Sequence, residues 1–103
     1  MKRVTSMITK ENVLPELKQY RQEFGGQYGI LSLGIFGSLS RGSVSDKSDI
    51  DVVVRLKEPN LFTLSRIRID LEERLHCPVD IVSFRERMNS FLKTRIQQEA
   101  TYV

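Results

Sequence analysis

The chain has 103 residues, of which 40% are hydrophobic and 28% are charged. This length supports one hydrophobic core, and this composition is typical of a folded globular protein rather than a disordered one. The formal net charge of +3 is too small to mark a nucleic-acid-binding surface unless the basic residues cluster, so we do not expect direct nucleic-acid binding. A single cysteine, Cys77, excludes an intrachain disulfide and fits a cytoplasmic protein.

The apolar stretches of the chain are too short for a membrane span or a secretory signal. We therefore expect no membrane association. Residues 1–8 are expected to form a loose leader, because they contain no periodic apolar pattern. The remainder shows no repeat, low-complexity tract or long linker, so residues 9–103 are expected to form a single domain.

The first expected element is a helix that is capped by Thr9 and stopped by Gly25-Gly26. Pro15 lies near its start, so the helix is expected either to begin late or to kink there. Residues 29–36 then form a nearly continuous apolar run that starts at one glycine and is followed by another. Such a short run favours a buried strand over a helix.

The following elements alternate between helix and strand. Residues 38–44 are expected to form a short helix or turn, and residues 50–56, with three consecutive valines, predict a second strand. Apolar residues recur at steps of three and four over 61–76, which predicts an amphipathic helix. A third strand over 79–84 and a last helix over 87–99 complete the pattern. The alternation predicts an α/β (α+β) domain in which helices flank a small mixed sheet.

The segment between the first two strands contains a glycine turn. It reads Gly37-Ser38-Leu39-Ser40-Arg41-Gly42 and starts where the first strand is expected to end. Gly37 allows the backbone to approach a phosphate closely, while Ser38 offers a hydroxyl and an amide at a turn or helix start. The segment therefore predicts a phosphate-binding turn.

Two carboxylates follow this turn. Asp49 and Asp51 are two residues apart, so both project from one face if the strand includes them. Two like charges this close need a compensating cation, and paired carboxylates with phosphate oxygens are a common Mg²⁺ site. Asp80 begins the third strand as Asp51 begins the second. A helical crossover over 61–76 is long enough to make these strands parallel, which would bring both acids to one edge; antiparallel strands would separate them.

Other motifs fail at identifiable positions. Ser43-Val44 stands where a P-loop needs Lys followed by Ser or Thr, and Val52, Val53 and Val54 occupy positions that an EF-hand needs for ligands and glycine. One histidine beside one cysteine supports neither a Ser-His-Asp nor a Cys-His arrangement.

The run Gly37-Ser38-x-x-Arg41-Gly42, followed by Ser48-Asp49-Ile50-Asp51, resembles the signature of the DNA polymerase beta-like nucleotidyltransferase superfamily. More specifically, it resembles the minimal members of that superfamily, the MNT domains, and the resemblance covers nearly the whole chain. Ser40 stands where the family often has alanine, as does Val44, but neither change removes a ligand.

This resemblance implies transfer of AMP from ATP to a hydroxyl, with pyrophosphate as the leaving group. Free-standing MNT proteins resemble antitoxins of HEPN-domain toxins, whose tyrosine they adenylylate, so we expect a HEPN toxin as partner. The resemblance implies that Asp49, Asp51 and Asp80 hold Mg²⁺ and carry catalysis. It also implies nucleotide contacts from Gly37, Ser38, Arg41 and Ser48.

Several alternatives stay open. Arg41 is equally well explained as a structural arginine, and Ser48 as the cap of the turn before the acids. The chain could instead be an antitoxin that binds nucleotide without catalysis and neutralises its toxin by stoichiometric contact. It could also use a small-molecule or RNA acceptor. The sequence leaves homo- and hetero-oligomers open.

Overall fold

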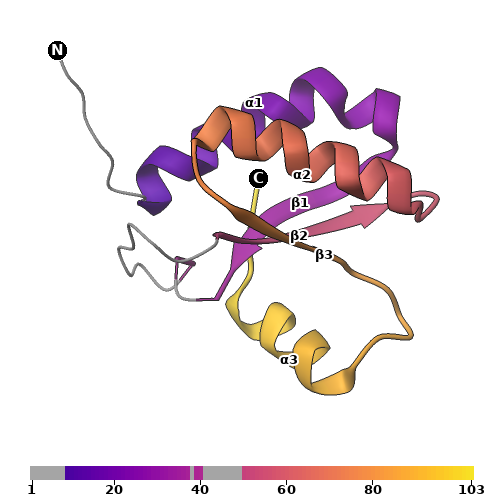
Figure 1. Ribbon diagram of the computed structural model, residues 1–103. Helices are drawn as coiled ribbons and strands as arrows, with labels where there is room; N and C mark the ends of the chain where they lie inside the picture. The colour runs from indigo at the N-terminus through magenta and orange to yellow at the C-terminus, as the bar shows by residue number, and fades with distance from the viewer. Residues whose placement is uncertain (1–8, 38, 41–49) are drawn as a thin grey trace, which may run out of the picture.

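In the computed structural model, a four-stranded mixed sheet separates two layers of helix (Figure 1). The structure describes residues 9–37, 39–40 and 50–103. The elements are, in chain order, α1 (Lys10–Tyr28), β1 (Ile30–Phe36), β2 (Ile50–Leu56), α2 (Leu61–Leu75), β3 (Val79–Ser83), α3 (Ser90–Glu99) and β4 (Thr101–Tyr102). Helices α1 and α2 cover one face of the sheet and α3 lies on the other, which confirms the predicted fold class.

The strand order in the sheet is β3-β2-β1-β4. β1 pairs antiparallel with both β2 and β4, whereas β2 pairs parallel with β3. The parallel pair is joined through α2, as the predicted crossover requires. The expected loose leader over 1–8 lies outside the described residues, as does most of the segment between β1 and β2.

Helix α1 is longer than its sequence predicts. It begins at Lys10, before Pro15, and it continues through Gly25-Gly26 to Tyr28. Its C-cap, Gly29, adopts a left-handed conformation with φ of 65°. The predicted stop at Gly25-Gly26 is therefore wrong. Aromatic packing explains the continuation, because the rings of Phe24 and Tyr28 stack at 5.7 Å and contact the core in the last turn.

The helix caps follow the sequence more closely. The Thr9 hydroxyl accepts a hydrogen bond from Asn12 N–H, and the Asn60 side chain accepts from Phe62 N–H and Thr63 N–H at the start of α2. These side chains satisfy backbone donors that the first turn of a helix leaves without partners. Helix α3 begins three residues later than predicted.

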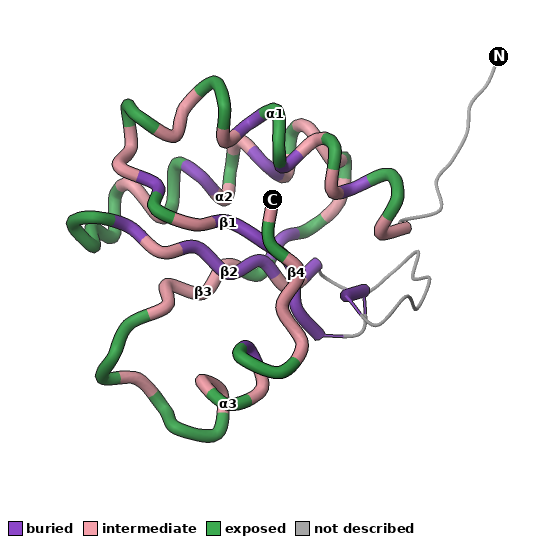
Figure 2. The backbone as a smooth tube through the Cα atoms, turned by 180° about the vertical axis from the view of Figure 1, so that it is seen from behind, coloured by how far each residue is buried: buried purple, intermediate pink, exposed green. Residues whose placement is uncertain are grey.

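The two faces of the sheet bury separate groups of side chains, and buried positions follow β1 and β2 closely (Figure 2). The larger group joins α1 and α2 to the sheet and includes Val52 and Val54, whereas Val53 belongs to the smaller group under α3. Successive strand residues point to opposite faces, which explains the three consecutive valines. No helix in the described ranges is both long enough and apolar enough to span a bilayer.

The short strand β4 depends on a glycine in its neighbour. A side chain at Gly34 would place its Cβ 2.9 Å from Tyr102 Cα and closer still to the Thr101 carbonyl oxygen. Only a residue without a Cβ allows β4 to pair at this position. Strand β4 has no counterpart among the elements predicted from sequence, because its two residues carry no periodic signal.

Candidate functional site

Two aspartates meet at one edge of the sheet. Asp51 and Asp80 are each the second residue of their strand, and they are partners in the parallel register of β2 and β3. Two residues further on, Val53 and Val82 pair in the same register and pack under α3. Alternation along the strands therefore places both acids on the α3 face. The two acids therefore lie side by side on adjacent strands, as the sequence predicts.

Burial differs between the two acids. Asp80 is exposed and Asp51 is partly buried. Like charges on neighbouring positions of adjacent strands repel one another, and a bound cation relieves that repulsion. The pair is thus an accessible carboxylate site at the sheet edge.

The glycine turn lies directly against Asp51. Phe36, the last residue of β1, is the register partner of Asp51, and Gly37 follows with φ of 77°. A Cβ on Gly37 would lie 2.5 Å from Asp51 Oδ2. Glycine is needed here for two reasons: the left-handed backbone conformation, and the room that the carboxylate occupies. The turn and the acid pair form one continuous site.

The structure brings together three of the predicted site residues: Gly37, Asp51 and Asp80. The other four, Ser38, Arg41, Ser48 and Asp49, lie outside the described residues. Within the described ranges, no group of three or more acidic, histidine or cysteine side chains is arranged to hold a metal ion. The expected metal-binding role of Asp49 stays a prediction.

Glu99 is a neighbour of the turn that sequence reasoning missed. Its Oε1 accepts a hydrogen bond from Gly37 N–H at 3.2 Å, although 62 residues separate the two. Arg95, one helical turn earlier, lies 3.6 Å from the same oxygen, and its guanidinium lies 5.9 Å from the centre of the Phe36 ring. No spacing rule within α3 signals this contact, because it depends on how α3 packs on the sheet.

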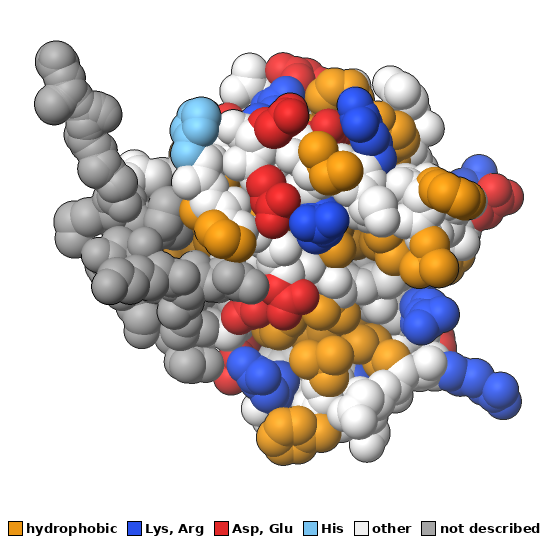
Figure 3. Space-filling model, in the orientation of Figure 1, with side chains coloured by type: hydrophobic (Ala, Val, Ile, Leu, Met, Phe, Trp, Pro, Cys, Tyr) orange, Lys and Arg blue, Asp and Glu red, His pale blue; other side chains and the backbone are white. Residues whose placement is uncertain are grey.

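One face of the molecule is mixed in charge. Figure 3 shows acidic and basic side chains interspersed over the described part of one face, with hydrophobic side chains between them. This part of that face therefore has no extended basic patch of the kind that a nucleic-acid polymer binds. The expected absence of direct nucleic-acid binding stays a prediction.

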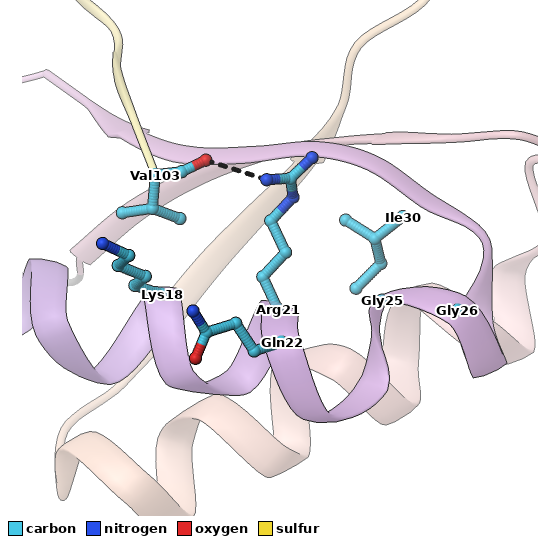
Figure 4. A pocket seen from close by; sticks show the side chains of 7 residues that line it. All are labelled: Lys18, Arg21, Gln22, Gly25, Gly26, Ile30 and Val103. Carbon is cyan, nitrogen blue, oxygen red and sulfur yellow. Dashed lines mark hydrogen bonds between the residues drawn. The ribbon is translucent and has the colours of Figure 1, made fainter.

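A pocket of about 310 Å³ lies elsewhere, between α1, the start of β1 and the C-terminal segment. Figure 4 shows Arg21 reaching across it, where one guanidinium nitrogen donates to the Val103 carbonyl oxygen at 3.3 Å. The second terminal nitrogen of Arg21 donates to the Leu31 carbonyl oxygen at 3.1 Å. The lining residues do not include the acid pair or Gly37. Arg21 here anchors the C-terminal segment to α1.

Residues 14–103 match the family described as the nucleotidyltransferase domain. The chain belongs to the nucleotidyltransferase family. This nucleotidyltransferase is 29% identical over 99 residues to the protein adenylyltransferase MntA of Thermococcus cleftensis, covering 95% of this chain and 99% of that one. It is also 36% identical over 78 residues to a proposed protein adenylyltransferase of Methanocaldococcus jannaschii, covering 75% of this chain and 83% of that one.

Solved structures agree with this assignment. A proposed minimal nucleotidyltransferase superposes with a TM-score of 0.75 at 26% identity, over 91% of this chain and 95% of that one. A chain of a toxin–antitoxin complex with AMP-PNP gives 0.68 at 19% identity, over 82% and 70%. A chain of the complex between the tri-AMPylated Shewanella oneidensis HEPN toxin and its MNT antitoxin gives 0.55 at 17%, over 84% and 71%. The last two likenesses establish the fold.

Proposed function

We propose that this nucleotidyltransferase transfers AMP from ATP to a hydroxyl, most simply a tyrosine hydroxyl, of a partner HEPN-domain toxin and thereby acts as its antitoxin. The observation that carries the proposal is the acid pair Asp51 and Asp80, in register on adjacent strands, with the Gly37 turn against one of its carboxylates. A site of this form suits a nucleotide that carries both metal ion and phosphates.

The donor set of the site fits Mg²⁺. Carboxylate oxygens are its preferred protein ligands, and the lack of a side chain at Gly37 lets Asp51 Oδ2 lie directly against the phosphate-binding turn. We assign Asp49, Asp51 and Asp80 as the residues that would hold the ion. When bound, Mg²⁺ neutralises charge on the phosphate oxygens and on the leaving pyrophosphate.

The protein's own residues then have distinct tasks. The Gly37 turn lets the triphosphate approach the backbone, and we assign Ser38, Arg41 and Ser48 as further nucleotide contacts. We assign the exposed Asp80 carboxylate as the group that accepts the proton of the incoming hydroxyl. The hydroxyl oxygen forms a bond to the α-phosphorus of ATP, the bond between that phosphorus and the α–β bridging oxygen breaks, and pyrophosphate leaves.

The proposed acceptor is a protein. The curated relatives are named protein adenylyltransferases, and two of the solved structures with this fold are complexes of toxin and antitoxin. One of those complexes holds an ATP analogue and another a toxin that is already AMPylated. These names support a HEPN toxin as the acceptor for this chain as well.

The test combines the protein, Mg²⁺, labelled ATP and the HEPN-domain protein that the proposal takes as its partner. We expect the α-phosphate label to appear on the HEPN protein and the γ-phosphate label to leave with pyrophosphate. Label transfer without any partner would instead favour a small-molecule or RNA acceptor. Full toxin neutralisation by a variant that carries both Asp51→Asn and Asp80→Asn would favour stoichiometric binding.

A further inference from the structure

The junction between α3 and β4 holds the turn that follows β1 through hydrogen bonds. Glu99 accepts a hydrogen bond from Gly37 N–H through its side chain. Its backbone carbonyl accepts a second hydrogen bond from the Ser40 hydroxyl, and that hydroxyl also lies 2.9 Å from Thr101 Oγ1. The turn is held from the other side by Lys10, whose ammonium donates to the Ser40 carbonyl oxygen at 2.9 Å. The described residues of the turn are thus fixed at both ends.

The junction is a firm support, because the segment that follows it is held by both β1 and α1. Gly34 of β1 pairs with Tyr102, and Val103 N–H donates to the Leu33 carbonyl oxygen at 2.9 Å. The Arg21 guanidinium holds the Val103 carbonyl from α1 (Figure 4). Glu99 precedes this anchored segment by two residues, so its backbone position is set by the sheet.

A carboxylate beside a phosphate-binding turn needs an explanation, because its charge repels a triphosphate. Arg95 supplies one, since its guanidinium lies 3.6 Å from Glu99 Oε1 and offsets that charge. A hydrogen bond to a charged acceptor is stronger than one between neutral groups, so the carboxylate orients the Gly37 amide firmly. A glycine can adopt many backbone conformations, and this hydrogen bond favours the left-handed one that Gly37 has.

We propose that Glu99 is a positioning residue for nucleotide binding, which holds the Gly37 turn in its binding conformation without touching the nucleotide. This inference rests on the proposed function, in which the turn receives the phosphates of ATP. The competing explanation is that Glu99 occupies the phosphate position and must be displaced from the Gly37 amide. The two explanations predict opposite changes in affinity when the carboxylate is removed.

The experiment measures binding of AMP-PNP with Mg²⁺, which needs no acceptor protein. Because a hydrogen bond to a charged group is lost, we expect Glu99→Ala to bind about ten- to a hundredfold more weakly. Glu99→Gln keeps a neutral acceptor oxygen and should lose less affinity than Glu99→Ala, about three- to tenfold. Gln98→Ala, an exposed substitution in the same helical turn, is the matched control. Equal or tighter binding by Glu99→Ala overturns the proposal, as does a Glu99→Gln variant as weak as Glu99→Ala.

A second readout separates this proposal from the proposed function. In the ligand-free protein, Glu99→Ala should speed hydrogen exchange of the Gly37 amide about tenfold or more, and Glu99→Gln should speed it less. Unchanged exchange overturns the positioning role even if nucleotide binds. If the unmodified protein binds no AMP-PNP, the proposed function fails, and the exchange rates alone decide whether Glu99 fixes the turn. Should Glu99→Ala not fold, Glu99→Asp carries the same predictions, because it withdraws the carboxylate by one methylene.

Discussion

Replacing Gly37 by alanine tests the close contact between the glycine turn and the carboxylate of Asp51. A Cβ at this position lies 2.5 Å from Asp51 Oδ2, so the carboxylate must withdraw by about 1 Å to restore an ordinary van der Waals distance. A left-handed alanine costs about 1–2 kcal/mol. Alanine also lowers the conformational entropy of the unfolded chain, which offsets about 0.4–1 kcal/mol of this destabilisation. We therefore expect a net stability loss of about 1 kcal/mol and, because a 1 Å misplacement disrupts catalysis, a rate loss of about a hundredfold.

The assays are urea unfolding and the rate of AMP transfer from α-labelled ATP. Gly26→Ala is the control, because a Cβ there meets no atom within 4 Å and lies in the interior of α1. It should raise the free energy of unfolding by about 0.5–1 kcal/mol and leave the transfer rate unchanged. A folded Gly37→Ala protein that retains the unmodified rate would refute the placement of Asp51 against the turn.

Two further predictions concern the support of the site. Gly34→Ala should displace β4, because its Cβ meets backbone atoms of Thr101 and Tyr102. Loss of the strand's hydrogen bonds should lower the free energy of unfolding in urea by about 2–4 kcal/mol. An unchanged unfolding midpoint would contradict this role of Gly34. Tyr20 is buried and donates to Asp70 at 2.8 Å, and burial, with this bond, raises the pKa of its phenol. The raised pKa means that the protonated phenol stabilises the folded protein. This stabilisation is fully present below the unfolded pKa of about 10 and is lost as pH rises toward the folded pKa. Tyr20→Phe should therefore be about 1–2 kcal/mol less stable at pH 7, with a difference from the unmodified protein that shrinks above pH 10; a constant difference would argue against the raised pKa.

Local patterns in the sequence predict much of this fold. The apolar period over 61–76 and the valine run at 50–56 each place an element within one residue of its observed bounds. The helix at 61–76 is also the crossover between the strands at 50–56 and 79–84. A connection of this length allows the two strands to be parallel, which predicts that Asp51 and Asp80 meet. These predictions succeed because each depends on neighbours in the sequence.

The features that the sequence did not reveal depend on tertiary packing. Gly25-Gly26 carries a stop signal that the stacked rings of Phe24 and Tyr28 override. Strand β4 forms because Gly34 leaves room for it, and the approach of two backbones leaves no periodic trace. Glu99 reaches Gly37 only after α3 has packed on the sheet. Contacts across 62 residues of chain cannot be read from the spacing of residue types.

The central claim is that the acid pair beside the Gly37 turn performs AMP transfer to a protein hydroxyl. Its most direct test is the intact mass of the partner HEPN protein after incubation with Mg²⁺, ATP and either the unmodified protein or its Asp80→Asn variant. We predict added adenylyl groups with the unmodified protein and none, or a trace, with the variant. A HEPN protein that gains no mass with the unmodified protein, or gains it equally with both, would contradict the claim.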